Sequence, residues 1–195
     1  RPESYKAASM DVYANNLFEN MRYLPEISVK TFKPQDSGFP LFGRYLTLWL
    51  FYPAIAQRQE ADINHILDHS ISHLIASLDT KKTIITCHDL IGLEFPISTP
   101  FWKRKIFWSN ILRNMSKARK IIAVSQHTKD DILKYSSYKS DDIAVIYVGI
   151  NTAFRHIDKD KVKERFKFKK PAILHVSHDN FYKNVEGLIK AIALL

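Results

Sequence analysis

The stretch Lys82–Leu90, KTIITCHDL, decides the fold of this 195-residue chain. Thr83–Cys87 is a short run rich in β-branched residues, and it stops abruptly at His88 and Asp89. A run of this length is too short for a helix and predicts a buried strand. In open parallel sheets, ligands bind outside the carboxyl ends of the strands. We therefore expect His88 and Asp89 to lie on the rim of a binding cleft.

Three further apolar runs predict neighbouring strands, and polar or small residues follow each of them. The runs are Asp62–Leu67, Lys120–Val124 and Ile143–Val148. The residues that follow are Asp68, His69 and Ser70, then Ser125, Gln126 and His127, and finally Gly149 and Asn151. Helical patterns alternate with the strands, which predicts an α/β fold with a parallel sheet and helices on both faces. Polar residues at one edge of that sheet predict a cleft, although they name no reaction.

The remaining elements are predicted from periodicity and from turn residues. Helices are expected over residues 9–24, about 44–60, 71–78 and 101–117, and another is expected to follow a cap at Ser125 or Thr128. Alternation in Ile27–Phe32 predicts a strand. Gly92 and two prolines predict a loop over Ile91–Pro100.

A charged stretch, His156–Lys170, predicts a surface helix or linker and marks a domain boundary. We expect a first domain over residues 1–155, the linker over 156–170, and the start of a second α/β domain over 171–195. Ala172–Val176 would be the first strand of that second domain, and Glu186–Leu195 its first helix. Both ends of the sequence look cut, because it starts at Arg1 in place of Met and its last residues, Leu188–Leu195, lie in an unfinished helical pattern. The first domain also lacks the strand that should precede its opening helix.

Composition is that of an ordinary globular protein, with 46% hydrophobic and 25% charged residues. The net charge of +9 suggests an anionic partner such as nucleic acid, a membrane surface or a phosphorylated small molecule, although it can also serve solubility alone. The single cysteine, Cys87, excludes an intrachain disulfide and suits a reducing cytoplasm. Tyr45–Ala56 is too short to span a bilayer and is interrupted by Pro53.

His88 has several chemical readings. It could act as a general acid or base, or donate a hydrogen bond to a substrate hydroxyl, and Asp89 could fix its tautomer. A lone histidine is nevertheless more often a structural residue than a catalyst. His69 and His88 could bind a metal together, but ligands at motif spacing are absent, so we expect no metal.

The segment Ser177–Asn184, SHDNFYKN, lies between the predicted strand and helix of the second domain. Backbone amides at a helix start and the ammonium of Lys183 together suit a diphosphate. The alternative is a surface lysine beside a helix-capping Asn184, and the motif alone does not separate the two.

The segment Phe101–Trp108, FWKRKIFW, interleaves aromatic residues with three cations. It could bind nucleic acid, because aromatic side chains stack on bases and cations contact phosphates. It could lie on an anionic membrane, which suits an enzyme with a lipid-linked acceptor. The favoured reading is an ordinary helix with Phe101, Phe107 and Trp108 in the core.

Several motifs together resemble family 4 glycosyltransferases. They are TCHDL at Thr86–Leu90, IIAVSQHTKDDI at Ile121–Ile132 and VIYVGIN at Val145–Asn151. HVSHDNFYKN at His175–Asn184 is similar to the first loop of that family's donor-binding domain. The resemblance covers nearly the whole chain in the right order, and the combination is more specific than any one motif.

This resemblance implies a GT-B fold, in which two Rossmann-like domains face each other across a cleft. The first domain would bind a glycan or lipid-linked acceptor and the second a nucleotide-activated sugar, with retention of configuration and no cofactor or metal. His88 would lie near the transferred sugar. The remaining site residues implied are Asp68, His69, Asp89, Ser125 and Gly149 on the substrate side, and Ser177, Lys183 and Asn184 at the donor diphosphate. The expected location is the cytoplasm or the inner face of an anionic membrane, with no nucleic acid partner.

The chain also departs from the family pattern. YKAAS at Tyr5–Ser9 stands where many members carry a glycine-rich loop, and His178–Asn180 stands where many carry an arginine. The pair of glutamates that marks the donor domain is absent, so we expect these 195 residues alone to be inactive. A basic domain that binds nucleic acid or membrane without catalysis, and a non-catalytic carbohydrate-binding domain, remain as alternatives.

Overall fold

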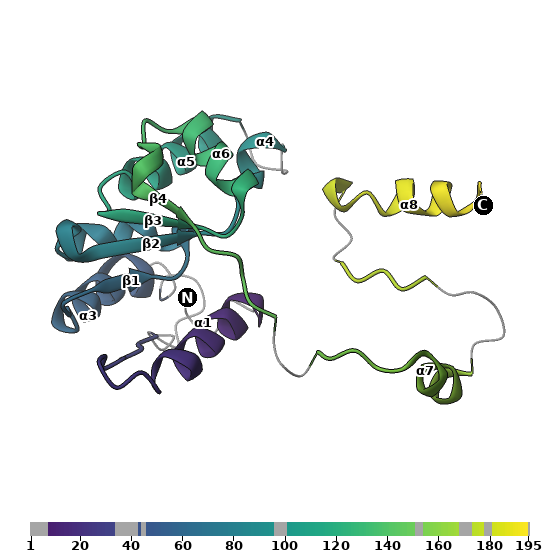
Figure 1. Cartoon of the computed structure of the whole chain (residues 1–195). Helices are drawn as coiled ribbons and strands as arrows, with labels where there is room; N and C mark the ends of the chain where they lie inside the picture. Colours follow the sequence, from purple (N-terminus) through teal and green to yellow (C-terminus); the bar gives the residue numbers. More distant parts are fainter. Residues whose placement is uncertain are drawn as a thin grey trace. The chain divides into compact units, whose positions relative to one another are not determined.

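The computed structural model describes residues 8–33, 43, 46–95, 101–150, 154–167, 173–177 and 181–194 (Figure 1). It divides into two compact units, Arg1–Gly149 and Ile150–Leu195. The described part of the second unit holds α7 (Lys159–Phe166), the short turn η5 (Phe181–Lys183) and α8 (Val185–Ile192).

The first unit is built on a parallel sheet of four strands, in the order β1-β2-β3-β4. The strands are β1 (Asn64–Ile66), β2 (Thr83–Cys87), β3 (Lys120–Ala123) and β4 (Ile143–Val145). All three neighbouring pairs are parallel, so the four carboxyl ends lie at one edge. The predicted α/β class and parallel sheet are confirmed, and β2 has the bounds expected from the sequence.

Helices and helical turns connect and cover these strands. They are α1 (Ala8–Met21), η1 (Thr47–Phe51), α3 (Tyr52–Arg58), η2 (His69–Ser77), η3 (Thr80–Lys82), α4 (Ile91–Glu94), α5 (Phe101–Met115), α6 (Gln126–Tyr135) and η4 (Ser140–Asp142). The π-helical turn η1 ends just before Pro53, which has no backbone N–H to donate to the preceding turn. Within the described ranges, no helix is both long and apolar enough to cross a membrane.

Three predicted elements are wrong. Ile27–Phe32 carries no strand, although its residues alternate. Residues 173–176 of the expected strand Ala172–Val176 also carry none, and Ala172 lies outside the described residues. The expected loop Ile91–Pro100 begins with the short helix α4, while residues 96–100 lie outside the described ranges. Alternation and apolar runs predict a strand only where a neighbouring strand supplies the hydrogen bonds.

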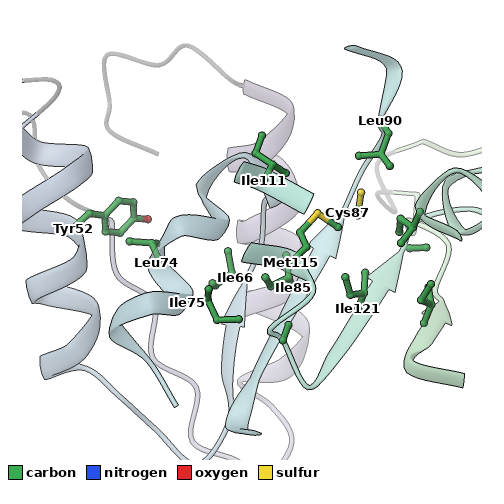
Figure 2. Packing of buried hydrophobic residues seen from close by; sticks show 14 residues of the cluster. Tyr52, Ile66, Leu74, Ile75, Ile85, Cys87, Leu90, Ile111, Met115 and Ile121 are labelled. Atoms are coloured by element: carbon green, nitrogen blue, oxygen red, sulfur yellow. The ribbon is translucent and has the colours of Figure 1, made fainter. Parts of the chain in front are cut away.

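The core gathers around β2, as Figure 2 shows. Ile85 and Cys87 are fully buried, and they pack with Ile111 and Met115 from α5 and with Ile75 from η2. Burial strongly raises the pKa of the Cys87 thiol, so this cysteine stays protonated. Cys87 is therefore a buried structural thiol.

Gly92 lies in α4 where this short helix packs closely against Trp108 of α5. A Cβ on the buried Gly92 would lie 2.5 Å from Cζ2 of Trp108, so only a glycine lets α4 approach the indole. Trp108 packs against the core, as the favoured reading of α5 expects. Phe107 does not, because it is 53% exposed; the side chain of Phe101 lies outside the described residues.

Replacing Gly92 by alanine should lower the free energy of unfolding of the first unit by about 1–3 kcal/mol, because the new methyl group overpacks the indole of Trp108. Urea unfolding followed by far-UV circular dichroism measures the change. Gly149→Ala is the matched control, because a Cβ there meets nothing within 4 Å. Equal stability of the two variants would contradict the packing argument.

Candidate functional site

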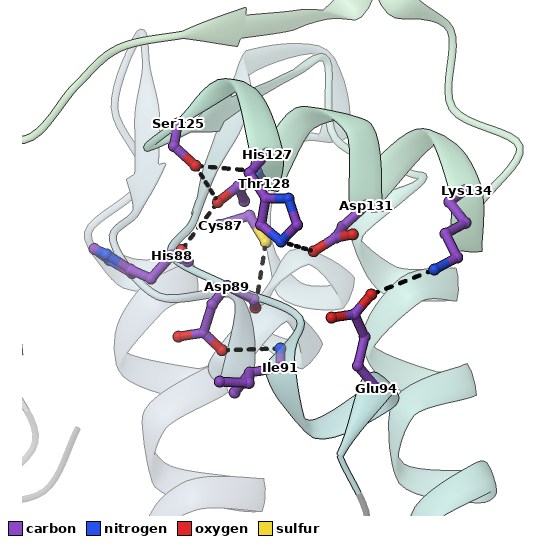
Figure 3. Close-up of polar contacts among 10 residues, drawn as sticks. All are labelled: Cys87, His88, Asp89, Ile91, Glu94, Ser125, His127, Thr128, Asp131 and Lys134. Atoms are coloured by element: carbon purple, nitrogen blue, oxygen red, sulfur yellow. Dashed lines mark hydrogen bonds and ion pairs between the residues drawn. The ribbon is translucent and has the colours of Figure 1, made fainter. Parts of the chain in front are cut away.

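His88 lies directly after β2, half-buried at the carboxyl edge of the sheet (Figure 3). Its Nε2 is 2.9 Å from the backbone oxygen of Leu67, at the end of the neighbouring strand. A carbonyl can only accept, so Nε2 must carry a proton, and in the neutral ring Nδ1 is left as an acceptor. Tyr13 of α1 packs edge-on against the same imidazole, with ring centroids 5.0 Å apart. The ring is therefore held in one orientation.

The backbone of His88 is held by the start of α6. The hydroxyl of Thr128 donates to the His88 carbonyl at 3.2 Å, and Thr128 Oγ1 is 2.9 Å from Oγ of Ser125 (Figure 3). Ser125 is also the N-cap of α6, accepting from the amide of Thr128 at 3.0 Å. The predicted cap is confirmed. Ser125 lies at the same edge as His88, and Thr128 forms hydrogen bonds to both residues.

A second histidine, His65, lies behind this edge in β1. Its Nε2 is 2.8 Å from the hydroxyl of the fully buried Thr86. Burial, and secondarily the neighbouring His88, lower the pKa of His65 to about 4, so His65 is neutral near pH 7. The sequence analysis did not single out His65. Its position inside the apolar run Asp62–Leu67, which predicts a strand next to Thr83–Cys87, could have indicated a buried histidine. The Leu67 carbonyl leaves no sequence signal, because it is a backbone group.

Asp68 and His69 follow β1 and are both buried. Asp68 is the N-cap of η2, with Oδ1 accepting from the amide of Ser70 at 2.9 Å. His69 stacks on Trp108 of α5, with centroids 5.9 Å apart and planes 19° from parallel. Burial, together with nearby Asp68, raises the pKa of Tyr52 to about 12. These residues shape the β1 end of the edge.

Asp89 and Gly149 have less direct links to His88. Asp89 is exposed and accepts from the amide of Ile91 at 3.2 Å, which helps to start α4. The His88 ring is fixed by the Leu67 carbonyl instead, so the suggested tautomer role of Asp89 has no support. Gly149 is exposed in open space at the end of the first unit.

The three predicted donor-phosphate residues lie in the second unit. Lys183 is exposed at the end of η5, with Nζ 5.5 Å from the centroid of the Tyr182 ring. Asn184 adopts a left-handed conformation (φ 51°) and caps α8, with Oδ1 accepting from the amide of Gly187 at 3.2 Å. Ser177 Oγ is 2.7 Å from Nε2 of His175. Asn184 is therefore the N-cap of α8, and Lys183 lies exposed directly before it.

One group of side chains has the composition of a metal site. Among the described residues, Glu94, His127 and Asp131 each bring a ligand atom within 4.8 Å of the others. His127 Nε2 lies 3.5 Å from Asp131 Oδ2, and Lys134 Nζ lies 3.3 Å from Glu94 Oε1 (Figure 3). Burial raises the pKa of Asp131, and His127 opposes that shift. Lys134 already pairs with Glu94 and His127 contacts Asp131, so both carboxylates have side-chain partners within the described residues.

Comparison with known proteins identifies the family. The sequence model of Glycosyltransferase Family 4 matches residues 12–154, which include every strand of the sheet and the edge that carries His88. The chain belongs to glycosyltransferase family 4. This match covers most of the first unit and ends before Lys183 of the second.

Three relatives named serotype-specific mannosyltransferase WbdA, all from Escherichia coli, match 122 residues of this family 4 chain. Two are 30% identical and one is 28% identical over that stretch, which is 58% of this chain. The match spans only 14–15% of the length of these relatives. No solved structure matches the chain at a significant level.

Stability of the first unit should fall as the pH falls from about 6.5 to about 4. The folded state holds His65 with a lowered pKa, so the unfolded state binds more protons in this window and acid favours unfolding. This residue alone should make unfolding about 2 kcal/mol easier at pH 5 than at pH 7.5. All three tryptophans lie in the first unit, so urea titrations followed by tryptophan fluorescence report on it.

The matched pair for this test is His65→Gln against His156→Gln, since His156 is exposed in the second unit. The first substitution should remove about 2 kcal/mol of the pH dependence, and the second should leave it unchanged. His73, whose pKa burial also lowers, keeps its own share in both variants. An unchanged pH dependence in His65→Gln would contradict the assignment.

Thr128→Val should lower the free energy of unfolding by about 1 kcal/mol, because the buried hydroxyl that holds the His88 carbonyl is lost without a change of shape. Tryptophan fluorescence in urea measures this loss too. Thr80→Val, at an exposed threonine, should change stability by less than about 0.5 kcal/mol. If both variants behave alike, the contact from Thr128 to His88 contributes nothing measurable.

Proposed function

We propose that the protein transfers a sugar from a nucleotide-diphosphate donor to a glycan or lipid-linked acceptor, with retention of the anomeric configuration. The observation that carries the proposal is the family match over residues 12–154, which coincides with the sheet edge where His88 is held. In the transfer, the bond from the anomeric carbon to the diphosphate oxygen breaks and one to an acceptor oxygen forms. The proton of that acceptor hydroxyl passes to the departing diphosphate or to His88 Nδ1.

His88 would serve this reaction through Nδ1. Because Nε2 is committed to the Leu67 carbonyl, Nδ1 is the ring atom available to accept a hydrogen bond or proton from a sugar hydroxyl. The neutral His65 behind it places no positive charge beside the ring near pH 7. Asp68, His69, Asp89, Ser125 and Gly149 would line the acceptor side.

Lys183 would bind the donor diphosphate and stabilise it as a leaving group, a purely electrostatic role that needs no metal. It is exposed and carries no ion pair within the described residues, so its charge is available to an anion. Ser177 and Asn184 would add polar contacts from the same segment. The WbdA relatives are named mannosyltransferases, so a mannose nucleotide is the first donor to test.

The acceptor would be presented on the cytoplasmic side, with peripheral contact to an anionic membrane. The net charge of +9 supports an anionic surface as a neighbour. Nucleic acid is not part of this proposal.

In the complete protein, His88→Gln should reduce kcat for sugar transfer by about 10²- to 10⁴-fold, the range typical for loss of a positioned acid or base. Transfer is measured with radiolabelled mannose nucleotide beside other sugar nucleotides, and the anomeric configuration of the product is read by NMR. His73→Gln is the matched control, because His73 also donates from Nε2 to a backbone carbonyl, at 2.8 Å from Leu48.

The control should retain most of its turnover. Unchanged turnover in His88→Gln would remove His88 from the mechanism. Absence of transfer, and of binding, with every sugar nucleotide tested would overturn the proposed function itself.

A further inference from the structure

Helix α5 presents two different faces. Its inner face carries Ile111 and Met115, both buried in the core, and the half-buried Trp108. Its other side carries Trp102 and Ile106, which are 60% and 57% exposed. Burial of one face is ordinary for a helix on a sheet, but large apolar side chains on the opposite face need a separate explanation.

The exposed residues form an ordered surface, which we call the outer face of α5: Trp102, Lys103, Lys105, Ile106, Phe107 and Arg113. With 3.6 residues per turn, Trp102, Ile106 and Arg113 lie along one line, with Lys103 and Lys105 on opposite sides of it. Phe107, 53% exposed, lies beside Lys103. An apolar centre between two lysines is therefore built into the helix.

Charge on this helix has one sign. The segment Phe101–Met115 contains four cationic residues and no aspartate or glutamate. Across the described parts of the chain, neither Lys103 nor Lys105 is ion-paired with a carboxylate. Lys103 Nζ instead lies 5.2 Å from the centroid of the Trp102 ring. These cations are available to an anionic surface that lies against the outer face.

The combination fits a lipid bilayer better than nucleic acid. Tryptophan favours the boundary between headgroups and acyl chains, and lysine stems can extend along apolar surface while the ammonium groups reach lipid phosphates. An aliphatic side chain such as Ile106 gains nothing from base stacking, yet it gains from insertion among acyl chains. A basic amphipathic helix of this kind lies in the plane of the interface without spanning it.

Helix α5 begins near the sheet edge that carries His88, so a membrane bound to its outer face would lie near the acceptor. The helix connects the carboxyl end of β2 to the start of β3, so its first turns lie at the same edge as His88. The stacking of Trp108 on His69 shows that the first half of α5 reaches that edge. A membrane under the outer face would therefore lie close to the acceptor side of the site.

We propose that the outer face of α5 docks on an anionic lipid bilayer, with Trp102 and Ile106 inserted at the interface and Lys103 and Lys105 at the lipid phosphates. This inference deepens the proposed function by naming the surface that brings the domain to a lipid-linked acceptor. It rests on that function for its purpose, while the lipid binding is measurable without any sugar.

The test is co-flotation of the 195-residue chain with vesicles of phosphatidylcholine, with or without 30% phosphatidylglycerol. Binding should be at least about tenfold tighter to the anionic vesicles and should weaken with salt. Lys103→Glu/Lys105→Glu should weaken it by about 30-fold or more, and Trp102→Ser/Ile106→Ser should abolish the part that survives high salt. Circular dichroism checks that each variant is folded.

Lys117→Glu/Arg119→Glu is the matched control, since it makes the same charge change at exposed residues beyond the far end of α5. It should weaken binding by only about threefold, through net charge alone. Equal losses in the two charge variants, or equal binding to neutral and anionic vesicles, would overturn the proposal. So would tighter binding to single-stranded DNA than to anionic vesicles, lost with the same two lysines.

A second measurement covers the case in which a variant fails to fold. Brominated lipid in anionic vesicles should quench the tryptophan fluorescence of the unmodified chain, and Trp102→Phe should lose most of that quenching. No quenching in the unmodified chain would also overturn the proposal. Vesicle binding by this chain, together with no sugar transfer by the complete protein, would reject the proposed function and leave the docking surface standing. Transfer by the complete protein without vesicle binding would do the reverse.

Discussion

The burial of β2 is the constraint on which the first unit depends. This strand has a parallel neighbour on each side, and Thr83, Ile85, Thr86 and Cys87 are all fully buried. Polar atoms are accepted there only when they are paired: Thr83 donates to the Asp79 carbonyl at 2.7 Å, and Thr86 shares a hydrogen bond with His65 at 2.8 Å. A strand fixed in this way ends at a defined point in space, and the residue at that point is His88.

The fixed strand end controls the chemistry that His88 can perform. The Leu67 carbonyl comes from the residue directly after β1, and Thr128 comes from α6, the helix that follows β3. The end of β1 therefore holds His88 by its ring, and α6 holds it by its backbone carbonyl. Burial lowers the pKa of the neighbouring His65 to about 4, so that residue places no positive charge beside the His88 ring near pH 7. The sheet therefore sets both the orientation and the electrostatics of the site.

Sequence patterns predicted most of this frame because the deciding information is local. The apolar run Thr83–Cys87 and the Ser125 cap each follow from a few neighbouring residues, and both are confirmed. The failures are non-local. Gly92 looked like a loop residue, but its role is to admit the indole of Trp108, which lies sixteen residues later. The hydrogen-bond partner of the His88 ring is the backbone oxygen of Leu67, just after β1, and no residue type predicts a backbone contact. The strand expected at residues 172–176 rested on apolar character alone.

Helix α5 shows most clearly what a periodic pattern leaves open. Aromatic and aliphatic residues occur on both of its faces, so the letters FWKRKIFW predict an apolar core contact and an apolar exposed surface equally well. The structure separates them, because Ile111 and Met115 are buried while Trp102 and Ile106 face away from the core. Apolar area left in water costs stability and solubility unless something covers it. Since the same helix carries cations and no carboxylate, whatever covers that area must also be compatible with dense positive charge. An anionic bilayer meets both requirements at once, and it does so at the edge of the sheet where the acceptor would bind.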